Sequence, residues 1–290
     1  MPETVRPDGA RIHYEVHGEG FPVLLLADGP AGGDSAGWEE NFYHPVAELA
    51  ARFRVITVDL RHTGRSSAAP FAPFSYPEHA ADLVAVLDDA GAAEAHVVAA
   101  GTGTAVAWRL AHDAPARVRS VVAERPVGLD GTNTPGDFLG TYDEPMRHAR
   151  AEGIAGVIAA AEPDGDFARN PGAGPYAARL AADPAFREEL TALRRERYIV
   201  ALVRFRDGIW PAGSPYFSVP EQWPASLGSP LLILSGSDPL HPEGLAKRLA
   251  DEVPGARILD AGHAGADRRE ATVATIASFL NEHTPEPEDR

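Results

Sequence analysis

Short apolar runs alternate along the chain with longer segments whose apolar residues recur about every 3.6 positions. The runs are typical of strands buried on both faces, and they are Phe21–Leu26, Arg54–Asp59, Ala95–Ala100, Val118–Ala123, Pro230–Ser235 and Ala256–Leu259. Arg11–Val16 alternates in character and predicts a further strand. Helical spacing predicts helices over Glu39–Arg52, Pro77–Ala90, Thr104–Asp113, Pro242–Glu252 and Asp267–Asn281. This order predicts an α/β fold, with a mostly parallel central sheet and helices on both faces.

The alternation stops in one long segment, between about Pro126 and Pro224. This segment is rich in glycine and proline and has helical spacing, most clearly over Pro184–Asp207. We interpret residues 126–224 as a helical cap inserted into a core formed by residues 1–125 and 225–283. Residues 284–290 combine proline with acidic residues and predict a disordered tail.

Composition narrows the function classes. The net charge of -16 opposes contact with a phosphate backbone, so nucleic-acid binding is not expected. The absence of cysteine excludes disulfides, thiolate metal sites and a cysteine nucleophile. No apolar run is long enough to span a bilayer, and the first residues lack the pattern of a secretory signal. We therefore expect a cytoplasmic protein without a membrane partner.

Five short motifs follow one another in a fixed order. They are Leu24–Gly33, Val58–Ser66, Val97–Ala111, Leu232–Pro239 and Leu259–His263. Each is weak alone, but together they resemble the α/β-hydrolase superfamily over nearly the whole chain. The similarity is greatest to its prolyl-iminopeptidase and epoxide-hydrolase-like branch, which carries a cap domain. The resemblance implies the fold more strongly than the function, because this fold hosts many chemistries.

The third motif matches the nucleophile elbow of that superfamily, in which a strand leads through Gly-x-Ser-x-Gly into a helix. Ala99 takes the place of the first glycine, Gly101 that of the nucleophile and Gly103 that of the last glycine. Glycine has no group that can attack a carbonyl. Thr102 is a poor substitute, because its position belongs to the residue whose backbone N–H forms part of the oxyanion hole. We therefore expect no acyl-enzyme and an empty volume beside His263, where a serine hydroxyl would sit.

The resemblance also implies an acid–base pair. Asp238 matches the acid of the family's triad and His263 its base. Asp238 would accept the Nδ1–H of His263 and leave its Nε2 free to take a proton, which typically contributes about 10²–10⁴-fold to a rate. Glu124 is an alternative partner for His263, since some relatives, among them cofactor-free dioxygenases, place the acid there.

The loop after the predicted strand Phe21–Leu26 matches the family's oxyanion loop. The resemblance implies that its backbone, at Asp28 or its neighbour Gly29, donates to an oxyanion together with the Thr102 N–H. A carboxylate at Asp28 is unusual in this place. If its side chain points into the pocket, its negative charge opposes a developing oxyanion and argues against acyl transfer.

The first functional hypothesis is a non-hydrolytic enzyme, a lyase, isomerase, cyclase or decarboxylase that works by His/Asp acid–base catalysis. Its substrate would be a small apolar organic molecule, aromatic or polyketide-like, bound against the cap aromatics Trp210, Tyr216 and Phe217. The alternatives are a hydrolase of an ester, lactone or epoxide that uses a His-activated water, and a non-catalytic ligand-binding protein. No organic cofactor and no metal is implied, and a homodimer is left open.

Overall fold

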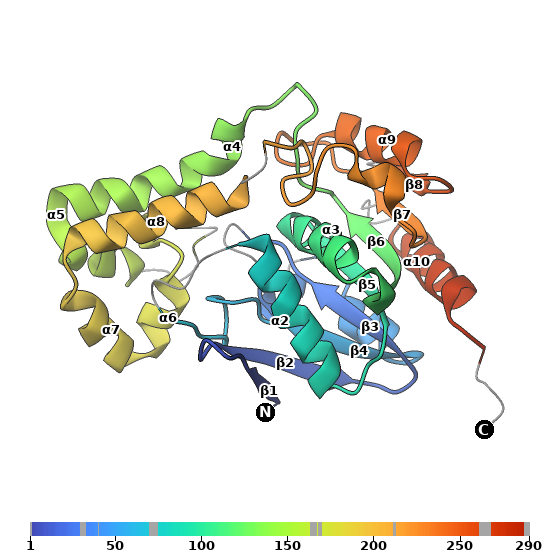
Figure 1. The fold of residues 1–290 in the computed structure, drawn as a ribbon, viewed down its shortest axis with the longest axis horizontal. Coiled ribbons are helices and arrows are strands. Elements are labelled where there is room, and N and C mark those ends of the chain that lie inside the picture. Colours follow the sequence, from blue (N-terminus) through green and yellow to red (C-terminus); the bar gives the residue numbers. More distant parts are fainter. Residues whose placement is uncertain are drawn as a thin grey trace.

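The computed structural model describes residues 2–29, 33–39, 41–69, 75–162, 167, 170–210, 213–260 and 268–286 (Figure 1). Within them, eight strands form one sheet in the order β1-β2-β4-β3-β5-β6-β7-β8. The strands are β1 (Glu3–Val5), β2 (Arg11–His17), β3 (Phe21–Leu26), β4 (Phe53–Val58), β5 (Ala95–Ala100), β6 (Val118–Glu124), β7 (Leu231–Leu234) and β8 (Arg257–Leu259). β1 and β2 pair antiparallel, as do β2 and β4, and all later pairs are parallel.

Helices cover both faces of this sheet. They are α1 (Pro45–Leu49), α2 (Tyr76–Asp89), α3 (Thr102–Asp113), α4 (Pro135–Leu139), α5 (Asp143–Ala161), α6 (Ala177–Ala182), α7 (Pro184–Thr191), α8 (Arg195–Ile209), α9 (Glu243–Glu252) and α10 (Arg269–His283). Single 3₁₀ turns occur at Ser35–Trp38, Pro115–Arg117, Gly140–Tyr142, Pro171–Ala173 and Trp223–Ser226. The apolar faces of α2, α3 and α9 enter one core, and those of α1 and α10 enter a second core on the opposite face of the sheet. The predicted α/β fold class is confirmed.

Local sequence explains why these elements form where they do. The four last residues of β3 are fully buried, as expected for a parallel strand covered on both faces. At the start of α2, the Ser75 hydroxyl accepts the Glu78 N–H, and Pro77 supplies the dihedral angle that the first turn needs. The predicted helix over Glu39–Arg52 is wrong. Of the described residues in this range, only Pro45–Leu49 is helical, because a proline disfavours helical geometry in the residue before it and cannot donate a helical hydrogen bond.

The segment between β6 and β7 contains α4 to α8, which lie together at one side of the sheet (Figure 1). α5 is interrupted at Gly153, where the backbone is not helical. Whether residues 126–224 act as a separate cap domain stays a prediction. In the predicted tail, the Thr284 hydroxyl lies 3.0 Å from Nε2 of His96, so Thr284 is anchored to the core. Residues 287–290 lie outside the described part of the chain.

The parallel strands β3, β5, β6 and β7 are direct neighbours in this order. Their carboxyl ends therefore meet along one edge of the sheet, which is where open α/β sheets place their ligands. Asp28 follows β3, Gly101 follows β5, Glu124 ends β6 and Asp238 follows β7. Among the described helices, none is both long enough and apolar enough to cross a membrane.

Candidate active site

The turn from β5 into α3 has the geometry of a strained elbow at Gly101. Its backbone angles are φ 51° and ψ -123°, a conformation that glycine adopts at little cost because it has no Cβ. A Cβ at this position would lie 2.0 Å from Cγ of Asp28 and 2.2 Å from each of its carboxylate oxygens. The Asp28 side chain therefore fills the place that a side chain at residue 101 would occupy. The place where a serine side chain would begin is thus not empty, although His263 itself lies outside the described residues.

The Asp28 carboxylate is held mainly by backbone N–H groups. Its Oδ1 accepts the N–H of Thr102 and the N–H of Gly29, each at 2.8 Å. The Thr102 hydroxyl lies 3.0 Å from the same oxygen and donates to the Gly29 carbonyl at 2.6 Å. Thr102 and Gly29 thus provide the two donors expected to form an oxyanion hole. In this structure both N–H groups donate to Asp28 Oδ1, and their role in an oxyanion hole stays a prediction.

The second oxygen of Asp28 faces a histidine that the sequence analysis did not single out. His241 lies in the loop between β7 and α9, and its Nε2 is 3.6 Å from Asp28 Oδ2. Its Nδ1 is 2.9 Å from Oδ2 of Asp238 and 3.0 Å from Oδ1. The His241 side chain is 8% exposed, against 34% for Asp28 and 50% for Asp238. The imidazole therefore bridges two carboxylates, and Asp28 remains reachable by a ligand.

The loop that carries His241 is fixed by its own short contacts. Asp238 Oδ1 accepts the backbone N–H groups of Leu240 and His241, at 2.9 and 3.1 Å. Gly236 allows the close return of the chain, because a Cβ there would lie 2.4 Å from the His241 carbonyl oxygen. The position of His241 thus follows from the Asp-x-x-His spacing after β7 and from the glycine before it.

The charges of this site reinforce one another. Burial opposes ionisation of Asp28, but the hydrogen bond and charge of His241 and the Thr102 N–H outweigh it and lower the pKa of Asp28 to about 2. Burial likewise opposes the imidazolium of His241, yet Asp28 and Asp238 raise its pKa above the ordinary 6.5. The pKa of Asp238 is lowered, since His241 outweighs the effect of burial. The two carboxylates thus favour the imidazolium form of His241, which lies between them.

The predicted partners of the acid–base pair are only partly found. Asp238 binds a histidine, as expected, but that residue is His241. His263 lies outside the described residues, so its role stays a prediction. The sequence did contain a signal for His241, namely a histidine three residues after the candidate acid in the same loop. The family pattern, however, places the base after the following strand, at His263.

Glu124 is buried at the end of β6 and belongs to a separate group of side chains. Its carboxylate accepts hydrogen bonds from the Tyr43 hydroxyl and, at 2.9 Å, from the Asn41 side-chain amide. Burial raises the pKa of Glu124, and these two donors only oppose the shift. Glu124 is 1% exposed, and its place as a partner of His263 stays a prediction.

The predicted pocket aromatics are packed into the protein. The Tyr216 hydroxyl donates to Glu252 at 2.6 Å, and the Trp210 ring N–H donates to the Ser214 carbonyl at 2.9 Å. The Phe217 ring meets that of Phe138 edge-on at 4.8 Å. Within the described part of the chain, none of these contacts involves Asp28 or His241. Their role in binding a substrate stays a prediction.

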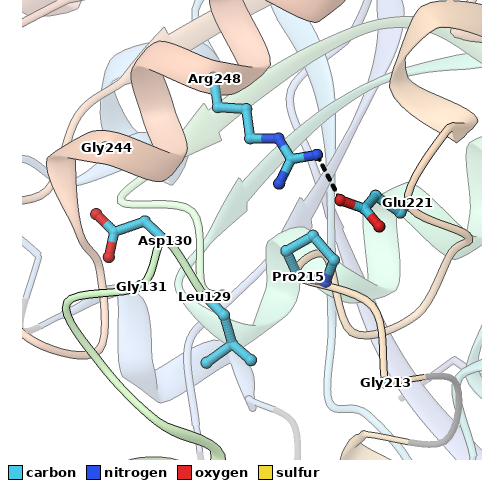
Figure 2. A pocket seen from close by; sticks show the side chains of 8 residues that line it. All are labelled: Leu129, Asp130, Gly131, Gly213, Pro215, Glu221, Gly244 and Arg248. Carbon is cyan, nitrogen blue, oxygen red and sulfur yellow. Dashed lines mark hydrogen bonds and ion pairs between the residues drawn. The ribbon is translucent and has the colours of Figure 1, made fainter.

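A pocket of about 480 Å³ lies beside these aromatics and α9 (Figure 2). It is lined by Leu129, Asp130, Gly131, Gly213, Pro215, Glu221, Gly244 and Arg248. Figure 2 shows the Arg248 guanidinium turned toward Glu221, with which it forms an ion pair at 2.8 Å. The pocket contains neither Asp28 nor His241, and its only lining cation is thus already paired with a lining carboxylate.

Comparisons with known proteins agree with the geometry of the sheet edge. A family model described as "Alpha/beta hydrolase family" matches residues 16–275. The chain is 45% identical over 113 residues to a putative carbamate hydrolase, RutD, of Azorhizobium caulinodans, which covers 39% of this chain and 40% of that protein. It is 39% identical over 111 residues to rhodomycin D methylesterase DnrP of Streptomyces peucetius, covering 38% and 36%.

The chain therefore spans about two fifths of the length of these curated relatives. A solved structure of the enol-lactonase from Burkholderia xenovorans LB400 has a similar fold, with a TM-score of 0.60 and 21% identity over 97% of this chain and 100% of that chain. The names of these proteins are those of hydrolases. The expectation of a non-hydrolytic lyase, isomerase, cyclase or decarboxylase is therefore wrong, and the hydrolase alternative agrees better with the relatives.

Proposed function

The chain belongs to the alpha/beta hydrolase family, and from that premise we propose that it hydrolyses a small organic molecule at the site formed by Asp28, His241 and Asp238. One observation carries this proposal. Where the family has its nucleophilic side chain, this chain has the Asp28 carboxylate, 3.6 Å from the imidazole of His241. A carboxylate at the place of the usual nucleophile and a histidine beside it, from the loop after β7, supply the two partners that hydrolysis needs.

His241 is the proton-transfer group in this proposal. Asp238 binds its Nδ1 at 2.9 Å, which fixes the ring and directs Nε2 toward Asp28. A histidine held in this way can give a proton to a leaving group and take one from water. Asp238 acts as a positioning residue, because its contacts in this structure are with His241 and the loop backbone.

The substrate class is narrowed by the charge of the site. The pKa of Asp28 is lowered to about 2, so its carboxylate is negatively charged at neutral pH. Because this charge lies at the reacting position, a substrate with an anionic group next to the cleaved bond is disfavoured. We propose a neutral small molecule as substrate. By their names, the relatives act on a carbamate, a methyl ester and an enol lactone, and these classes belong in the first substrate panel.

The proposal is tested by the His241→Gln variant against a panel of neutral esters, lactones, carbamates, epoxides and alkyl halides. We expect the wild type to hydrolyse at least one class and His241→Gln to lose about 10²–10⁴-fold in kcat for it. His44→Gln is the matched control, because His44 is exposed and makes no side-chain cap to α1. Equal rates in wild type and His241→Gln, or no hydrolysis of any class, would overturn the proposal.

A further inference from the structure

We infer that Asp28 is a covalent nucleophile that attacks a saturated carbon through Oδ2, so that the substrate is a neutral alkyl electrophile such as an epoxide or an alkyl halide. This inference rests on the proposed function and names the substrate class of the same site. It moves the nucleophile of the fold from the elbow after β5 to the loop after β3.

The two oxygens of Asp28 have different surroundings. Oδ1 accepts two backbone N–H groups, from Thr102 and Gly29, at 2.8 Å each. Oδ2 faces Nε2 of His241, and the side chain is 34% exposed. One oxygen is thus fixed by donors that suit a developing negative charge, and the other is available for bond formation. Nucleophilic attack by a carboxylate is established enzyme chemistry.

Attack on a carbonyl carbon is disfavoured in this geometry. A substrate carbonyl oxygen would need the N–H groups of Thr102 and Gly29, and Asp28 Oδ1 already takes up both. A tetrahedral adduct of a carboxylate with an ester would also expel the carboxylate again, because the carboxylate is a much weaker base than an alkoxide. Attack on a saturated carbon has neither difficulty, since no oxyanion forms on the substrate carbonyl and the new ester bond is stable until water attacks.

The first step is balanced by His241 when the leaving group is an oxygen. Asp28 Oδ2 forms a bond to a carbon of an epoxide, and the carbon–oxygen bond of the ring breaks. The released alkoxide takes the proton of the His241 imidazolium, which leaves an alkyl ester on Asp28 and a neutral imidazole. With an alkyl halide the leaving group departs as halide and needs no proton, and His241 releases its proton to solvent before it acts as a base in the second step.

The second step uses the oxygen that the backbone already holds. Neutral His241 takes a proton from water, and the resulting hydroxide attacks Cγ of Asp28. The oxyanion then develops on Oδ1, between the N–H groups of Thr102 and Gly29, where both donors are in place beforehand. The adduct collapses, the alcohol oxygen leaves with the proton from His241, and the new carboxylic acid returns its proton to His241. The net reaction adds one water to an epoxide to give a diol.

Gly101 makes this arrangement sterically possible. A Cβ there would overlap the carboxylate, at 2.0 Å from Cγ and 2.2 Å from both oxygens. The loss of the elbow side chain and the presence of a carboxylate in the loop after β3 therefore explain each other. A glycine at the elbow would by itself suggest that the nucleophile has been lost. Here the Asp28 carboxylate, from the loop after the neighbouring strand β3, occupies the space beside the glycine, which suggests that the nucleophile has moved to Asp28.

The deciding experiment is a single turnover in water enriched in oxygen-18, with the enzyme in excess over a neutral epoxide such as styrene oxide. Because water attacks Cγ of Asp28, we expect the heavy oxygen in the peptide that contains Asp28 and an unlabelled diol after the first turnover. Mass spectrometry of the digested protein and of the product reads both. A labelled diol with an unlabelled Asp28 peptide overturns the inference.

A second measurement uses the intermediate itself. His241→Gln should slow the attack of water on the alkyl ester, so the intact variant incubated with 1-bromobutane, whose leaving group needs no proton, should gain the mass of one alkyl group on Asp28. The double variant Asp28→Asn/His241→Gln should gain none, and Asp251→Asn/His241→Gln, changed at an exposed carboxylate, should gain it like the single variant. An adduct that survives Asp28→Asn, or no adduct in either arm, overturns the inference.

The inference and the proposed function fail in different ways. If Asp28→Asn keeps hydrolysing esters or lactones while His241→Gln does not, the chain is a hydrolase and Asp28 is not its nucleophile. If His241→Gln keeps the wild-type rate on every class, the proposed function itself fails. Epoxide turnover without halide turnover restricts the substrate to oxygen leaving groups and leaves the covalent step intact.

Discussion

Asp28 and Glu124 are two carboxyl groups at the same edge of one sheet, and their protonation differs in direction. Asp28 follows β3 and meets two backbone N–H groups and the imidazole of His241. Glu124 ends β6 and meets the hydroxyl of Tyr43 and the amide of Asn41. The pKa of Asp28 is lowered to about 2, whereas burial raises that of Glu124. His241 beside Asp28 accounts for the difference, because Tyr43, Asn41 and the charge of Arg125 together do not offset the burial of Glu124.

The comparison separates a reactive carboxylate from a structural one. Both residues lie at the carboxyl end of a strand of the sheet. Only Asp28 combines an ionised state, partial exposure and a proton-transfer partner, since Glu124 is 1% exposed. We therefore place the chemistry at Asp28 and treat Glu124 as part of the support behind the sheet edge.

The largest expected effect tests this division directly. Asp28→Asn removes the attacking oxygen while it keeps the size of the side chain, and we expect the loss of at least ~10³-fold in kcat/KM for the hydrolysed substrate. Glu124→Gln should stay within ~10-fold of wild type, because Glu124 touches neither His241 nor Asp28 among the described contacts. Steady-state kinetics of both variants decide it. A larger loss for Glu124→Gln than for Asp28→Asn would reverse the assignment.

The next effect concerns the fit between Gly101 and Asp28. Gly101→Ser places a Cβ 2.0 Å from Cγ of Asp28 and forces a side chain onto a strained backbone, so we expect a cost of about 2–5 kcal/mol in the free energy of unfolding. Gly91→Ser is the matched control, since Gly91 also has a positive φ but no atom within 4 Å of its added Cβ. Chemical denaturation measures both.

A double-mutant cycle isolates the steric part of that cost. In Asp28→Ala/Gly101→Ser the carboxylate no longer fills the space, so the double variant should be more stable than the sum of the two single changes predicts. Additive changes would show that Asp28 does not occupy the place of the residue-101 side chain. The double variant should remain inactive toward alkyl electrophiles, because it lacks the carboxylate.

The pH dependence gives a smaller but signed effect. The described charged groups that face His241 are Asp28 and Asp238, and Arg125 acts on Asp28. Since the first step on an epoxide uses the imidazolium proton, kcat/KM should fall as pH rises through the raised pKa of His241, above 6.5. On the acid side Asp28 stays ionised until its pKa of about 2. Asp238→Asn removes one carboxylate and should move the fall to lower pH.

Stability should follow the same direction for this group. The pKa of His241 is higher in the folded than in the unfolded chain, so its contribution is complete below 6.5 and is lost as pH rises through the folded pKa. Rate profiles and denaturation midpoints over the same pH range check both statements. A kcat/KM that rises with pH over this range would mean that His241 acts only as a base.

The sequence predicted the sheet better than the site. Phe21–Leu26 and Ala95–Ala100 were placed to the residue, because strands covered on both faces are continuous apolar runs bounded by polar or small residues. β1 (Glu3–Val5) was missed, since three residues at the edge of a sheet give no periodicity to read. The position of Gly101 at the turn between a strand and a helix was also predicted correctly, since β5 ends at Ala100 and α3 begins at Thr102.

The contact of the Asp28 carboxylate with the elbow at Gly101 could not be predicted from the sequence, for a physical reason. Asp28 and Gly101 are 73 residues apart, and only the pairing of β3 with β5 brings their loops together. The role of His241 depends on the close return of a loop at Gly236, which a pattern of apolar residues does not encode. Motif order singled out Asp238, but its contact with His241 could be seen only in three dimensions.

The smallest expected effect completes the comparison at Glu124. Its pKa is raised above the ordinary 4.5 by burial, so the folded chain holds this proton more tightly than the unfolded chain does. The contribution of Glu124 to stability is therefore complete below 4.5 and is lost as pH rises through the folded pKa. Glu124→Gln cannot titrate and still accepts a hydrogen bond, so its stability should lack this decline and exceed that of wild type only at the upper end of the range. Denaturation midpoints of the two proteins at a series of pH values measure the difference. Parallel curves would show that the pKa of Glu124 is the same in the folded and unfolded chains, and a wild-type stability that rises with pH relative to Glu124→Gln would show that the folded chain favours the ionised form.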